Sequence, residues 1–181
     1  VLSRADQWDV LKTAQNVNEE GIAHPIWWGN KKQIEKLKSE LEFDADIPIM
    51  HPKEETHNAQ KNKYGEVFLK QQKRRGQTLF SAQKLMRERN YYAAMMVNEG
   101  DADALITGYS RSYPSIVKPM LDLIGLAPGS TRIATTNVMI TQRGPMFLSD
   151  TAININPTAH DLIKITQMTS GVMKMFGIKP V

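Results

Sequence analysis

The sequence predicts an α/β protein whose first domain is a parallel sheet covered by helices on both faces. Helical and apolar strand-like segments alternate through the first two thirds of the chain, and this order is typical of parallel strands joined by helical crossovers. Three apolar stretches, 22–28, 46–50 and 102–107, have the length of strands buried on both faces. We therefore predict a three-layer α/β/α first domain at 1–128 and the opening part of a second α/β domain at 129–181.

The first two helices are predicted from apolar spacing and from their ends. The apolar residues of 7–20 fall near one helical face, and Gly21 ends the segment. A short strand follows at 22–28, with a proline that suits a strand start or edge. Asn30 is a suitable cap for the next helix, 31–41. These signals alternate as an α/β order requires.

Four more helices are expected in the first domain. A long helix is predicted at 54–75 despite Gly65 in its middle. Two others follow at 78–89 and 90–100, and a fourth at 116–124, after the strand at 102–107. The linker LAPGS then marks the domain boundary.

The remaining segment has a different pattern. Two β-rich segments, 132–141 and 145–155, are joined by QRGP, which predicts a hairpin or close strand pair. A helix of about five turns follows at 157–177, with a proline near its start and a glycine just past its end. The ends of the chain have the character of partial strands, so we expect a fragment whose second sheet needs further strands.

Composition restricts the class of protein. With 181 residues, 41% hydrophobic and 23% charged, the chain has an ordinary globular composition. No apolar run is long enough to cross a bilayer, and no basic stretch precedes an apolar core at the start of the chain. The absence of cysteine excludes disulfide frameworks and thiolate nucleophiles, and it suits a cytoplasmic location.

The positive charge of the chain favours anionic partners only weakly. The net charge is +4 and the pI about 9.2, and the basic residues gather mainly at 61–75 and 31–38. Both clusters are typical of helix ends and of solvated faces with interleaved Glu. No stacking aromatics or recognised module accompanies them, so nucleic acid is not expected as a partner. Without an apolar run that could span a bilayer, no membrane is expected either.

A loop rich in hydroxyl groups follows the strand at 102–107. Gly108 allows a turn, and then Ser110, Arg111, Ser112 and Ser115 precede or begin a helix. Helix N–H groups, hydroxyls and one guanidinium could converge on a phosphate or carboxylate. The alternative is that the hydroxyls and the proline shape a turn and cap the helix at Ser115.

Two further patterns have simpler structural explanations. HPKEETH at 51–57 contains metal-binding residue types, but its spacing matches no zinc helix motif and fits a solvated helix start, so no metal is predicted. Methionines at helical spacings are expected to fill the core: Met95, Met96, Met168, Met173 and Met175. No catalytic residue is predicted in the chain.

Several segments together resemble the phosphate acetyl/butyryl transferase family. They include NEEGIAHPIWWGNKKQIEKL, KRRGQTLFSAQKLMRERNYYAAMMVNEGDADALITG, KPMLDLIG and FLSDTAININPTAHDLIKI. LMRERNYYAAMMV, SRSYPSIVKP and DTAININPTA look most like the transferase-like C-terminal part of bacterial NADP-dependent malic enzymes. The resemblance covers almost the whole chain and implies a phosphotransacetylase or isocitrate dehydrogenase-like fold.

The resemblance implies two α/β/α domains with a cleft between them that binds acetyl-CoA or CoA. It also implies that the chain stops before the segment in which active members carry their catalytic serine, arginine and aspartate. Active members have arginine at two further places, where this sequence has Gln72 and Lys118. Gln has no charge and Lys offers only a point charge, whereas a guanidinium clamps phosphate through two hydrogen bonds. The resemblance places the CoA or phosphate contacts at Thr107, Gly108, Ser110, Arg111, Ser112, Lys118 and Gln72.

Three hypotheses about function follow. The first is a regulatory acyl-CoA-binding and oligomerisation domain of a malic enzyme, with the malate, NADP and divalent-metal sites in a separate domain outside this chain. The second is an active phosphate acetyltransferase in which Arg111, Lys73, Arg74 or Arg75 replaces the missing arginines. The third is an oligomerisation domain without a ligand. The first two imply acyl-CoA as a partner, and we expect self-association into a dimer or higher oligomer.

Overall fold

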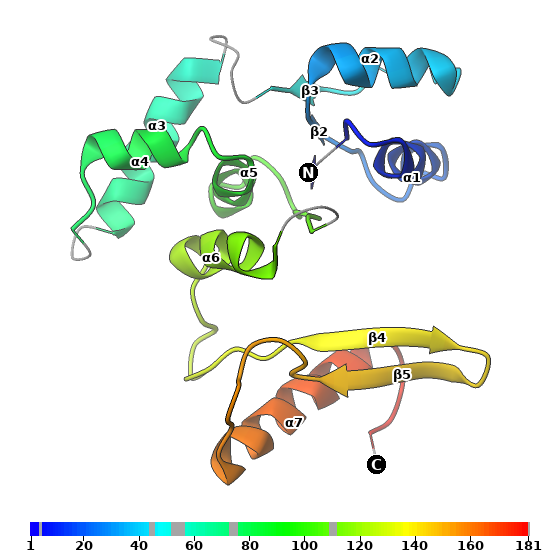
Figure 1. The fold of residues 1–181 in the computed structure, drawn as a ribbon, viewed down its shortest axis with the longest axis vertical. Coiled ribbons are helices and arrows are strands. Elements are labelled where there is room, and N and C mark those ends of the chain that lie inside the picture. The colour runs from blue at the N-terminus through cyan, green and yellow to red at the C-terminus, as the bar shows by residue number, and fades with distance from the viewer. Residues whose placement is uncertain (4, 44–45, 52–56, 73–75, 109–111, 181) are drawn as a thin grey trace. The chain divides into compact units, whose positions relative to one another are not determined.

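A computed structural model of the chain describes residues 1–3, 5–43, 46–51, 57–72, 76–108 and 112–180 (Figure 1). The backbone divides into two compact units, Val1–Gly125 and Leu126–Val181. The first contains a parallel sheet, and the second contains an antiparallel hairpin with one long helix. The predicted α/β class is confirmed.

The sheet of the first unit has short parallel strands in the order β1-β2-β3. These strands are β1 (Leu2–Ser3), β2 (Trp27–Trp28) and β3 (Ile49–Met50). On the other side of β1, Leu2 forms a single parallel bridge with Ile106. The sheet is therefore parallel, as predicted, and the segment 102–107 lies beside β1.

Two details of the predicted strands are wrong. The regular strands are shorter than the predicted ranges, because only two residues of each form ladder pairs. The segment 102–107 is also not buried on both faces, since the Ile106 side chain is 68% exposed. Within the described residues this segment pairs only with β1, which leaves it at the sheet edge.

Helices α1 (Trp8–Glu19) and α2 (Lys31–Glu40) pack with Trp27 of the sheet. The predicted ends of both helices are confirmed. Gly21 follows α1 with φ +66°, and the Asn30 side chain accepts a hydrogen bond from the Gln33 N–H at 3.4 Å. The core of this layer consists of Ala5, Leu11, Ala14, Trp27, Ile34, Phe43 and Ile47.

A second core, which includes Trp28, lies among the other helices of the unit. These helices are α3 (Asn58–Gln71), α4 (Leu79–Leu85), α5 (Arg89–Asn98) and α6 (Tyr113–Leu123), and Figure 1 shows them apart from α1 and α2. Met95 and Met96 fill this core as predicted. Helix α6 begins earlier than the predicted residue 116, since Pro114 is favourable in a first helical turn.

The two adjacent tryptophans of β2 lie in different cores, one on each face of the sheet. Successive residues of a strand point to opposite faces of a sheet. Trp27 belongs to the core of α1 and α2, while Trp28 stacks at 4.5 Å from Tyr92 in the core of α3 to α6. Neither indole has exposed surface, so helices cover both faces of the sheet at β2. The first unit therefore has three layers.

In the second unit, β4 (Thr136–Thr141) and β5 (Gly144–Ser149) form an antiparallel hairpin. Gly144, at φ +110°, follows its two-residue turn. Helix α7 (Ala159–Met175) begins with the capping box of Thr158 and Asp161, and its Thr169 is hydrogen-bonded to Ser149 of β5. The predicted hairpin and helix are confirmed.

The second unit also corrects two expectations. The strand predicted at 145–155 ends at Ser149, because Asp150 turns the backbone with φ +53°. Met175 is 86% exposed and fills no core within the described residues. Across the described part of the chain, no helix combines the length and apolar character that crossing a bilayer requires.

The close packing of α3 and α4 can be tested at Gly65. A Cβ at Gly65 would lie 2.9 Å from Cγ and 3.2 Å from Cα of Gln83. Gly65→Ala should therefore lower the free energy of unfolding by about 1–3 kcal/mol, measured by urea denaturation followed by circular dichroism.

Gly171 in α7 supplies the matched control, since a Cβ there would meet nothing within 4 Å. Gly171→Ala should raise stability by about 0.5–1 kcal/mol through helix propensity. Equal stability of the Gly65→Ala protein and the unchanged protein would contradict the packing of α3 against α4.

Candidate functional site

The side on which the chain adds strands to the sheet changes at β1. The chain passes from β1 through α1 to β2 on one side, whereas the segment carrying Ile106 lies on the other side of β1. In open parallel sheets, ligands bind outside the carboxyl ends of the strands at such a switch point. The residues at these ends are Ser3 of β1 and, after Ile106, Thr107 and Gly108. This edge is therefore the first place to look for a site.

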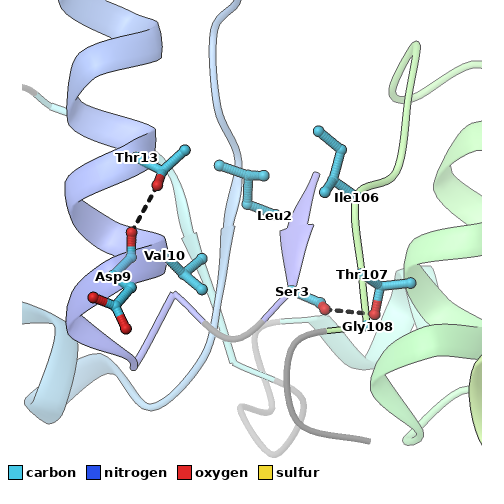
Figure 2. Close-up of a pocket in the computed structure, with 8 residues that line it drawn as sticks. All are labelled: Leu2, Ser3, Asp9, Val10, Thr13, Ile106, Thr107 and Gly108. Carbon is cyan, nitrogen blue, oxygen red and sulfur yellow. Dashed lines mark hydrogen bonds between the residues drawn. The ribbon is translucent and has the colours of Figure 1, made fainter. Parts of the chain in front are cut away.

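A cavity of about 280 Å³ lies at this edge (Figure 2). Its walls come from the end of β1, from the first turns of α1, and from the segment that leads into Gly108. The lining residues are Leu2, Ser3, Asp9, Val10, Thr13, Ile106, Thr107 and Gly108. The surface of the cavity is mainly apolar, and the hydroxyl groups of Ser3, Thr13 and Thr107 are engaged in hydrogen bonds, so the cavity suits an apolar group.

Thr107 and Asn90 connect several elements through a chain of hydrogen bonds. Ser3 Oγ donates to Thr107 Oγ1 at 2.7 Å, as Figure 2 shows, and Thr107 Oγ1 donates to Asn90 Oδ1 at 3.0 Å. Asn90 Nδ2 then donates to the main-chain oxygen of Ser115 at 3.3 Å. The end of β1, the start of α5 and the first turn of α6 are thereby held together.

Gly108 and Ser112 lie at the two described ends of the predicted anion loop. Gly108 has φ +129°, a backbone conformation that residues other than glycine rarely adopt. Ser112 is the cap residue of α6, but its side chain makes no capping bond; instead Ser115 Oγ donates to the Ser112 carbonyl at 2.7 Å. Ser110 and Arg111 lie outside the described residues. The alternative in which Ser115 caps the helix is wrong, since α6 starts at Tyr113.

A second cavity, of about 230 Å³, lies between α5 and α6. It is lined by Leu85, Glu88, Asn90, Tyr91, Ser115, Lys118 and Pro119. The Lys118 ammonium pairs with Asp122 Oδ2 at 2.7 Å, and the Tyr91 hydroxyl donates to the same oxygen, also at 2.7 Å. Burial, and then this hydrogen bond to Asp122, raises the pKa of Tyr91 above its usual value. The lysine charge is therefore already compensated.

Gln72 has a structural contact. Its side chain is buried at the end of α3, and Nε2 donates to the main-chain oxygen of Asp122 in α6. The amide satisfies a carbonyl near the end of α6, where main-chain acceptors lack helical partners. Gln72 and Lys118 thus meet at one residue of α6, whereas Thr107 and Gly108 line the other cavity.

The sequence did not identify Ser3, Asn90, Tyr91 or Asp122 as members of these sites. The spacing of Lys118 and Asp122, four residues apart on a helix, is a signal that could have revealed their ion pair. Ser3 and Asn90 gave no comparable signal, because sheet pairing and helix packing bring them to Thr107. Within the described ranges, no three His, Asp or Glu side chains form a metal-binding group, and 52–56 lie outside those ranges.

The chain of hydrogen bonds through Thr107 can be tested by removing its hydroxyl. Thr107→Val keeps the side-chain shape but leaves the Asn90 carbonyl and the Ser3 hydroxyl without this partner. We expect a loss of about 1–2 kcal/mol in the free energy of unfolding, measured by urea denaturation.

Thr13→Val is the matched control, because Thr13 lines the same cavity but bonds only within its own helix, to the Asp9 carbonyl at 2.8 Å. Its effect should stay within about 0.5 kcal/mol. If the two variants lost equal stability, the role of Thr107 in joining the elements would be refuted.

Several known proteins are similar to this chain in sequence, in fold or in both. An NADP-dependent malic enzyme of Haemophilus influenzae is 31% identical, over 99% of this chain and 24% of its own length. A phosphate acetyltransferase of Synechocystis is 27% identical, over 99% of the chain and 26% of its own length. The crystal structure of a phosphotransacetylase from Streptococcus pyogenes superposes with a TM-score of 0.87 at 30% identity, covering 99% of this chain and 55% of that one.

The chain spans about a quarter of the length of these two curated relatives and about half of the solved phosphotransacetylase. Its match to the family of phosphate acetyl/butaryl transferases extends over residues 1–181. The parallel sheet, the agreement of fold and the extent of this match lead to one conclusion: the chain belongs to the phosphate acetyl/butaryl transferase family.

Proposed function

We propose that the chain is the acyl-CoA-binding, regulatory and oligomerisation part of an NADP-dependent malic enzyme. Malic enzymes are among its relatives, and the similarity to them covers nearly the whole chain. In this proposal, the oxidative decarboxylation of malate to pyruvate takes place in another domain, together with NADP and the divalent metal. This chain would bind acetyl-CoA or CoA, and binding would change the activity of the malic-enzyme domain.

The contacts of Gln72 are the observation that carries the proposal. A transferase must fix phosphate beside the acyl carbon, and a bidentate guanidinium does so well. Gln72 occupies one of the two places where the family resemblance puts such an arginine, and its amide is buried against a main-chain oxygen of α6. Lys118 occupies the other and is paired with Asp122. Binding can persist at such a site while phosphate-dependent chemistry is lost.

Binding of a CoA diphosphate would draw on groups near the start of α6. Ser112 is exposed at the helix N-terminus. Pro114 has no main-chain N–H there, and the Ser115 N–H donates to the Ser112 carbonyl at 3.0 Å, so hydroxyl and guanidinium groups would carry most of the binding. Arg111 would supply the guanidinium. Thr107 and Gly108 line the neighbouring, mainly apolar cavity at the sheet edge, where an apolar part of the ligand would have room.

The second candidate is an active phosphate acetyltransferase that converts acetyl-CoA and phosphate into acetyl phosphate and CoA. The family match over the full chain and the phosphate acetyltransferases among the relatives favour it. In this case Arg111, Lys73, Arg74 or Arg75 would take over the role of the missing arginines.

The proposal also includes self-association. The hairpin carries exposed apolar side chains on both of its faces, among them Met139 and Met146, which pair across the strands, and the adjacent Ile140; they are 49%, 51% and 80% exposed. We expect a dimer or a higher oligomer by light scattering at micromolar concentration. A monodisperse monomer under these conditions would contradict this part of the proposal.

Titration calorimetry with acetyl-CoA tests the ligand. The protein should bind acetyl-CoA saturably, and Arg111→Ala should weaken binding about tenfold, because a hydrogen bond to a charged group contributes about 1.5–3 kcal/mol. Arg143→Ala is the control, since Arg143 is exposed in the hairpin turn of the second unit. Its affinity should equal that of the unchanged protein.

The same preparation should form no acetyl-CoA from acetyl phosphate and CoA above background. Robust turnover would establish the transferase in place of the regulatory domain. Acetyl-CoA binding that is unchanged by Arg111→Ala would remove the loop at 108–112 from the site.

A further inference from the structure

Asp122, in α6, is bonded to side chains from three helices of the first unit. Its carboxylate accepts a hydrogen bond from Tyr91 of α5 and pairs with Lys118 of α6. Its main-chain oxygen accepts from Gln72 of α3. Because these contacts come from three helices, the packing of the helices holds the carboxylate in position.

The two members of the ion pair differ in exposure. The Asp122 side chain is 19% exposed, whereas that of Lys118 is 69% exposed. The carboxylate is therefore the anchored partner, and the long lysine side chain is the partner that can move. Because the ammonium is largely exposed to solvent, the pair contributes little net stability, and exchange of the lysine to another partner is energetically accessible.

The charges around the α5–α6 cavity do not favour an incoming anion in the observed state. Lys118 is the one cation among the described lining residues, and its charge is compensated by Asp122. Glu88 adds a negative group to the same lining. An anion that uses Lys118 must first compete with the carboxylate of Asp122.

We propose that Asp122 regulates anion binding at this cavity as an intramolecular competitor for the Lys118 ammonium. A phosphate-bearing ligand displaces the ammonium from Asp122, and when the ligand leaves, the ion pair forms again. Tyr91 continues to satisfy the carboxylate while Lys118 is engaged with the ligand. The inference rests on the proposed function in so far as the ligand is acetyl-CoA, but inorganic phosphate tests the competition by itself.

The decisive variant is Asp122→Asn. It keeps the shape of the side chain and an oxygen that can accept from Tyr91, and it removes the negative charge. Binding of inorganic phosphate and of acetyl-CoA, each measured by titration calorimetry at about 0.15 M salt, should tighten about two- to fivefold, the range that corresponds to loss of an exposed ion pair. A purely structural role of Asp122 would produce the opposite change, since a disturbed site binds more weakly.

Glu40→Gln is the matched control for the change in net charge. Glu40 forms an ion pair with Lys36 at 3.7 Å, also four residues apart on one helix, and belongs to α2 in the other helical layer. Its affinity for both ligands should be unchanged. Lys118→Met should weaken phosphate binding at least about threefold, and the double variant Lys118→Met with Asp122→Asn should show no gain over Lys118→Met alone.

The possible results separate this inference from the proposed function. Phosphate binding that Asp122→Asn leaves unchanged, weakens or abolishes would overturn the inference, and so would an equal gain in Glu40→Gln. If acetyl-CoA fails to bind while Asp122→Asn tightens phosphate, the proposed ligand is wrong and the competition stands. Asp122→Ser provides a second neutral variant, and unfolding curves verify that each variant is folded.

Discussion

The alternation of Trp27 and Trp28 across β2 is the constraint on which the rest of the first unit depends. A strand of two residues contributes few hydrogen bonds, but its two indoles have no exposed surface and belong to different cores. Large aromatic side chains supply much apolar area to a core. Because they point to opposite faces, α1 and α2 are held on one side of the sheet and α3 to α6 on the other. The three layers follow from this placement.

That arrangement also determines where chemistry-bearing residues meet. With β2 beside β1 on one side and Ile106 on the other, the carboxyl ends of two neighbouring parallel segments lie at one edge. Ser3, Thr107 and Asn90 meet there through direct hydrogen bonds, although they come from a strand end, a loop and a helix. The start of α6 is tied to the same group through Ser115. The framework of the candidate site is thus provided by core packing and by neutral polar contacts.

Toward the other end of α6, Gln72 and Lys118 have structural partners. Gln72 is neutral, so it can be buried and donate to a carbonyl without the desolvation cost of a guanidinium. Lys118 keeps a positive charge, but a nearby carboxylate compensates it. These contacts favour packing of α3 and α5 against α6 over the clamping of a phosphate.

Local chemistry in the sequence determined the helices, the turns and the hairpin. Asn30, Gly21, Thr158 and the QRGP turn act within a few residues, so their effect can be predicted without knowledge of the rest of the chain. The parallel order of the sheet could also be predicted, because alternating helices and strands allow few other connections. The family resemblance rested on the same local segments.

Only the tertiary structure decided the lengths of the strands, the exposure of Ile106 and the partners of the site residues. A strand ends where its neighbour no longer offers hydrogen bonds, and that neighbour lies far away in the sequence. Likewise, the Gln72 amide has a carbonyl of α6 as its acceptor because α3 packs there, and Thr107 meets Asn90 through the docking of α5. Contacts of this kind depend on where whole elements lie relative to one another, and that placement results from burial of both tryptophans in separate cores rather than from any local pattern.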